Sequence, residues 1–160
     1  MAFGVSPTPE LSPARRYCLG MTNAHSEAAT YLAGLNETTR SLAVVAHEAF
    51  ASEGCSSYVK TIYIGYDIDG EMVAALYGHA DHVEVALALP EDAAGDLLVD
   101  ASHLTWRTLP VAAIIRSGDD IVDATSLIAF ACRRVRDREH AVERDNDFFI
   151  RSRRERRGEV

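Results

Sequence analysis

Apolar residues recur at three- and four-residue spacing in the first third of the chain and in one segment near its end. This helical period predicts helices over about 25–34 and 37–53 and a third over about 120–135. Asn36 is suited to cap the start of the second helix and Gly54 to follow its end. The chain is thus expected to open with two helices and to close with one.

Between the second and third helices the apolar period falls to two, which is typical of strands. Asp69-Gly70 is a strong hairpin signal, and loops of four or five residues permit only antiparallel pairing. In the third strand, alternation places His82 and Glu84 on a face that is at least partly open. The sequence therefore predicts an α+β fold with an antiparallel meander, and the expected strands are 58–66, 72–77, 82–89 and 106–116.

Composition indicates one globular domain. The 160 residues are 48% hydrophobic and 25% charged, which suits a single core. Residues 1–22 are rich in Pro, Ser, Thr and Gly and are expected to be a flexible lead-in. The domain is placed at 23–136 and an Arg-rich helix or tail at 137–160. No apolar run approaches the ~20 residues of a membrane span, and the start of the chain has no apolar stretch typical of a secretory signal.

The net charge of −8 is distributed unevenly. Ten of the sixteen Lys and Arg residues and seven of the twenty-four acids lie in 133–160, so this segment carries +3 and the remainder −11. An acidic body repels phosphate, which argues against a broad nucleic-acid surface. The three cysteines, Cys18, Cys55 and Cys132, form no CxxC pair, and such a scattered set is expected to be reduced in a cytoplasmic protein.

The order of these segments resembles that of the YdhG-like small bacterial domains of unknown function. The resemblance rests on YLAGLNETTRSLAVVAHEAF, on a strand block that ends in HVEVALALPED, and on LTWRTLPVAAIIRSGDDI, and it covers roughly 26–135. It implies the α+β fold. Because some relatives are described as frataxin-like iron chaperones, it also implies iron as an alternative cargo. It carries no catalytic motif onto any position of this chain.

His79, His82 and Glu84 are the candidate metal ligands, since imidazole and carboxylate can bind zinc or iron. His103 could add a third donor from a distant loop. The alternative is that polar residues populate a turn and a solvated strand face. The acids of the two hairpins, including DIDGE at 67–71, allow the same two interpretations.

An aromatic sheet face is the leading candidate for binding a small ligand or a protein partner. Aromatic groups with a few polar ones are usual in such sites, although they are also usual in packed cores. No motif of nucleophilic catalysis or phosphate binding occurs, so the sequence favours a non-enzymatic binding or accessory domain without a cofactor. A small enzyme of unspecified reaction is the third alternative, after the metal chaperone. The candidate ligand-binding residues are Tyr58, Lys60, Tyr66, Tyr77, Trp106 and Arg107.

Three adjacent apolar residues in the charged tail, Phe148, Phe149 and Ile150, are expected to have a partner, because such groups seldom face solvent alone. They predict either docking on the domain or a homodimer contact. A solvated Arg-rich helix is the alternative for the rest of the tail.

Overall fold

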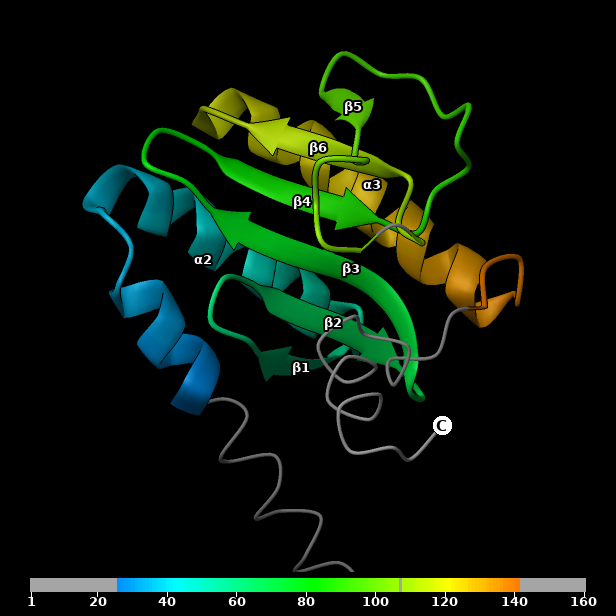
Figure 1. Ribbon diagram of the computed structural model, residues 1–160, viewed down its shortest axis with the longest axis horizontal. Coiled ribbons are helices and arrows are strands. Elements are labelled where there is room, and N and C mark those ends of the chain that lie inside the picture. Colours follow the sequence, from blue (N-terminus) through cyan, green and yellow to red (C-terminus); the bar gives the residue numbers. More distant parts are fainter. Residues whose placement is uncertain (1–25, 107, 142–160) are drawn as a thin grey trace, which may run out of the picture.

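The computed structural model describes residues 26–106 and 108–141, and it confirms the α+β class. Six strands form one antiparallel sheet in the order β1-β2-β3-β4-β6-β5. Helices α2 and α3 cover one face of it (Figure 1). The elements are α2 Glu37–Ser52, β1 Ser56–Val59, β2 Ile64–Ile68, β3 Glu71–Gly78, β4 Val83–Leu87, β5 Leu98–Asp100, β6 Val111–Ile115 and α3 Gly118–Arg136.

The first two helices form where the periodicity predicts them. Residues 26–33 are helical, and α2 begins after Asn36, whose side-chain oxygen accepts a hydrogen bond from Thr39 N. The buried face of α2 includes Leu42, Ala46 and Phe50. The Phe50 ring stacks on Tyr66 of β2 with a centroid distance of 4.0 Å, which docks the end of the helix on the sheet.

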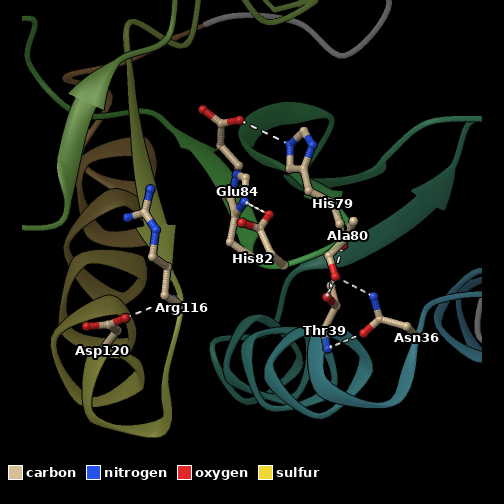
Figure 2. Close-up of polar contacts among 9 residues, drawn as sticks. Asn36, Thr39, His79, Ala80, His82, Glu84, Arg116 and Asp120 are labelled. Atoms are coloured by element: carbon tan, nitrogen blue, oxygen red, sulfur yellow. Dashed lines mark hydrogen bonds and ion pairs between the residues drawn. The ribbon is translucent and has the colours of Figure 1, made fainter.

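Helix α3 starts with a polar cap and continues as an amphipathic helix. The Asp120 carboxylate accepts hydrogen bonds from the backbone N–H groups of Arg116 and Ser117, and these bonds lower the pKa of Asp120. Figure 2 shows the Arg116–Asp120 contact. The buried residues of α3 recur at helical spacing and face the sheet and α2, and they are Ala124, Ile128, Ala131, Cys132 and Val135.

The prediction of a single strand over 58–66 is wrong, because these residues form a hairpin. β1 ends at Val59, the Lys60 N–H bonds to Tyr63 O, and β2 begins at Ile64. Tyr58 therefore pairs with Gly65 and lies on the face opposite Tyr66. The turn residues Lys-Thr-Ile-Tyr include none of the Gly, Pro, Asn or Asp that mark most turns, so the alternation appears uninterrupted in the sequence.

Two further differences concern the second half of the sheet. The expected strand 106–116 is reduced to β6, because Pro110 precedes it and Trp106 lies in a loop. The segment 91–102, for which no strand was expected, contributes the edge strand β5. With the division of 58–66 into β1 and β2, the sheet thus has two more strands than the sequence pattern indicates.

The face of β4 that was expected to be partly open is buried. Glu84 is 3% exposed, and every residue of β4 is buried. Trp106 and Leu109, from the loop that precedes β6, belong to the same core, and His103 of that loop contacts Glu84. Burial of a carboxylate requires hydrogen-bonding partners, and the residues around Glu84 supply them.

Several sequence-based expectations fall outside the described residues. These are the lead-in 1–22, Arg107, most of the tail 137–160, and the apolar triplet Phe148, Phe149 and Ile150. The homodimer contact through that triplet stays a prediction. Within the part that the structure describes, none of the helices has both the length and the apolar character required to cross a bilayer.

Candidate functional site

The turn that joins β3 to β4 is fixed by side chains of the N-terminal helices. Thr39 Oγ1 donates to His79 O at 3.0 Å, and Asn36 Nδ2 donates to Ala80 O, as Figure 2 shows. The Tyr31 hydroxyl accepts from Gly78 N at 3.2 Å and donates to Ile62 O. Three side chains therefore hold the backbone of this turn against the two helices.

The same turn closes on itself and brings its imidazoles together. His79 N–H donates to His82 O at 3.0 Å. The rings of His79 and His82 stack with a centroid distance of 4.4 Å and an interplanar angle of 13°. The backbone of His79 and His82 is thus fixed both by the turn and by the side chains that cap the helices. Only the side-chain torsions of the two histidines remain free to rotate.

Glu84 places a buried carboxylate beside these rings. Its Oε2 lies 3.1 Å from His79 Nε2, and its Oε1 lies 2.6 Å from His103 Nε2. The His79 imidazole and the Glu84 carboxylate point toward one another in Figure 2. The Glu84 side chain is 4% exposed, whereas those of His79 and His103 are 40% and 54% exposed. A carboxyl group with almost no solvent access is therefore covered by two imidazoles that solvent can reach.

Asp81 orients the other imidazole of the turn. Its carboxylate lies 2.7 Å from His82 Nδ1, and this hydrogen bond is the largest cause of the lowered pKa of Asp81. With Nδ1 held by a carboxylate, the opposite nitrogen of His82 is left for another partner. Metal-binding histidines commonly show this arrangement, in which a carboxylate fixes the ring and its tautomer.

The three predicted metal ligands lie together. His79, His82 and Glu84 each offer one ligand atom, and these atoms all lie within 4.8 Å of one another. Two imidazoles and a carboxylate are donors that suit zinc, iron and other first-row divalent ions. His103, from a loop nineteen residues beyond Glu84, reaches the same carboxylate. The sequence suggested His103 as a further donor, and the fold brings it to Glu84, although it is not one of the three residues whose ligand atoms lie within 4.8 Å of one another.

The predicted ligand-binding residues do not share an open face. Tyr66 is buried under α2, where its hydroxyl lies 2.9 Å from His47 Nδ1. Tyr77 and Trp106 are buried, and Arg107 lies outside the described residues. Tyr58 lies over Gly65 on the opposite side from Tyr66, and its hydroxyl donates to Met72 Sδ. The single-strand interpretation of 58–66 produced this expectation, and the hairpin removes its basis.

Lys60 lies at an open groove instead. Its ammonium lies 5.9 Å from the centre of the Tyr58 ring, a distance typical of a cation–π contact. The groove has a volume of about 420 Å³ and is lined by Ser26, Glu27, Thr30, Tyr31, Val59, Lys60 and Thr61. A second groove of about 710 Å³ lies beside β5 and includes Val99, Asp100, Ser102 and Pro110. Among the described residues, none of the predicted ligand-binding residues lines that second groove.

Sequence reasoning missed the residues that position the site. Thr39 is fully buried, and its hydroxyl contacts a turn forty residues further along the chain. A threonine in the first turn of an amphipathic helix gives no signal of such a contact, since it also fits an ordinary helix cap. Its burial, known only from the fold, identifies its role.

Comparisons of the chain with protein-family models, with curated proteins and with solved structures give no match. The functional argument therefore rests on the cluster itself.

Proposed function

We propose that this protein binds a first-row divalent metal ion, such as Fe²⁺ or Zn²⁺, through His79, His82 and Glu84. The observation that carries the proposal is the convergence of their three ligand atoms within 4.8 Å on a turn held by helix-cap side chains. A rigid backbone lowers the entropic cost of assembling ligands around an ion.

The burial of Glu84 favours a metal site over a solvated turn. A carboxylate in an ordinary turn is hydrated, whereas this one is inaccessible and has imidazoles at both oxygens. An ion at the cluster would take the place of the hydrogen bond between His79 and Glu84 and would provide a partner for the buried carboxylate. Asp81 would support His82 from outside, as carboxylates do for metal-bound histidines.

The donor set narrows the choice of ion. Calcium and magnesium prefer oxygen ligands only, whereas two imidazoles favour zinc, iron and their neighbours in the first transition row. Three protein ligands leave at least one coordination position for water or an exchanging ligand. Because the His79 side chain is 40% exposed, an ion here would be open to exchange. These features suit a metal carrier. The resemblance to the YdhG-like domains, some of which are described as frataxin-like iron chaperones, implies the same role.

The proposal is tested by titrating the purified chain with Fe²⁺ under argon and with Zn²⁺, using calorimetry and a competing chelator. We expect one ion per chain, and we expect joint replacement of His82 and Glu84 with Ala to weaken binding at least tenfold, or about 1.4 kcal/mol. His140→Gln is the matched control, because His140 lies beyond α3 and outside the cluster. Identical titration curves for the wild type and the double variant would contradict the proposal.

A second candidate function is binding of an anionic small molecule at the Lys60 groove. It is favoured by the open groove of about 420 Å³ that the Lys60 side chain lines. Lys60→Met keeps most of the apolar contact of the stem and removes the charge. Loss of binding with an unchanged melting temperature would support this function, and loss of stability without a binding defect would show that Lys60 is structural.

A further inference from the structure

Two cysteines that are far apart in sequence lie side by side at the opposite end of the sheet from the histidine cluster. Cys55 follows α2 and leads into β1, and Cys132 lies in α3. Their sulfur atoms are 3.5 Å apart although 77 positions separate them. A sulfur–sulfur bond is about 2 Å long, so the two atoms have to approach by only about 1.5 Å to form one.

The segments that carry the two thiols are also joined by an ion pair. Arg136 Nη1 lies 3.0 Å from Glu53 Oε2, and Arg136 Nη2 donates to Glu53 O. Glu53 is the C-cap that follows α2, and Arg136 is the last residue of α3. The thiols thus lie between two helix ends that are already held together, so covalent closure requires little movement.

The two thiols differ in acidity and in accessibility. The hydrogen bond between them lowers the pKa of Cys132, and the nearby guanidinium of Arg136 lowers it further. The same bond, together with burial, raises the pKa of Cys55. Cys55 is partly accessible and Cys132 is buried. Cys132 therefore carries the better nucleophile, whereas a solute reaches the sulfur of Cys55 first.

We propose that Cys55 and Cys132 form a reversible disulfide when the protein meets hydrogen peroxide. Peroxide transfers one oxygen atom to a thiol, giving a sulfenic acid and one water. The second thiol attacks that sulfur, a sulfur–sulfur bond forms, and the sulfenic oxygen leaves as a second water. Both sulfurs are oxidised by one electron each, and the peroxide is reduced by two. A dithiol reductant reverses the reaction by thiol–disulfide exchange.

The product would fasten the segment after α2 to the C-terminal part of α3. The link closes a long loop that contains β1 to β6, and closure of long loops restricts the unfolded chain most. The oxidised protein should therefore melt about 5 °C higher than the reduced protein.

The test is to treat the full reduced chain with one to five equivalents of hydrogen peroxide, digest it under non-reducing conditions, and map the peptides by mass spectrometry. We expect a peptide pair joined through Cys55 and Cys132, about 2 Da lighter than the sum of its reduced parts. Dithiothreitol should release it. Cys18→Ser should leave this result unchanged, since the third cysteine takes no part.

Cys55→Ser and Cys132→Ala each remove one sulfur and should abolish both the linked peptide and the rise in melting temperature. Because Cys132 is buried, Cys55→Ser at the more accessible position is the variant that keeps the test valid if Cys132→Ala folds poorly. A disulfide that involves Cys18, or overoxidation of separate thiols with no linked peptide in the wild type, would overturn the proposal.

Discussion

Glu84 Oε1 lies 2.6 Å from His103 Nε2, so a strand carboxylate with almost no solvent access is held by a half-exposed imidazole from a loop. This contact connects the loop after β5 to β4. It also leaves only the Oε2 side of the carboxylate for His79 and an ion.

Replacing His103 with Gln tests whether this imidazole positions Glu84 or binds the ion. If His103 only positions Glu84, its replacement should weaken metal binding about tenfold, which is less than the loss expected from His79→Ala. One ion should still bind per chain. Chelator-competition titrations of the three proteins measure this. An affinity loss equal to that of His79→Ala would instead make His103 a direct ligand.

Glu84→Gln should separate metal binding from folding. The amide keeps the shape of the carboxylate and removes its charge, so the buried site loses an anion that needs partners. We expect metal affinity to fall by at least tenfold while the urea-unfolding free energy of the metal-free protein changes by less than about 1.5 kcal/mol. A large stability loss with unaltered metal affinity would assign Glu84 a structural role alone.

Thr39→Val removes the hydroxyl that holds the carbonyl of His79. A buried hydrogen bond is lost and an acceptor loses a partner, so we expect destabilisation of about 1–3 kcal/mol in urea unfolding. Thr125→Val is the matched control, because the Thr125 hydroxyl is exposed and bonds only within its own helix, to Ile121 O. Equal effects of the two substitutions would show that the tether to the turn contributes no stability.

His140 should make stability depend on pH. Burial is the main cause of its lowered pKa, Arg134 lowers it further, and Glu71 opposes the shift. The folded state therefore binds this proton more weakly than the unfolded state, whose histidine pKa is about 6.5. The contribution of His140 to the stability of the folded protein is therefore present above the unfolded pKa of about 6.5. It is lost as the pH falls through the lower pKa of the folded state.

Urea unfolding at pH values from 8 to 5 tests the His140 prediction. The wild type should lose stability on acidification, and His140→Gln should lose less over the same range. Parallel curves for the two proteins would show that His140 makes no such contribution.

The sequence predicted best what is local along the chain. The hairpin at Asp69-Gly70 and the cap at Asn36 follow from a few adjacent residues, and the structure has both. His79, His82 and Glu84 lie within six residues, so a turn alone brings them near one another. The β1–β2 turn was missed because its residues, such as Thr61 and Ile62, are ordinary strand formers.

Contacts between distant segments could not be predicted in this way. His103 reaches Glu84 only because β6 pairs with β4 and the loop before it folds over the sheet. Cys55 and Cys132 appeared unrelated by spacing, and the packing of α2 against α3 brings them together. The aromatic face failed as a prediction for the opposite reason, since one unseen turn reversed the direction of Tyr58 relative to Tyr66.

The tethers from Asn36 and Thr39 to the carbonyls of Ala80 and His79 make the start of α2 and the β3–β4 turn one mechanical unit. An ion bound at the turn would touch no atom of α2. It would nevertheless slow local opening of the helix, because the first turn of α2 cannot leave without releasing the backbone that supports the ion. Amide hydrogens near Thr39 would then exchange with solvent more slowly when metal is present. Hydrogen exchange in α2 would thus detect an ion that the helix does not contact.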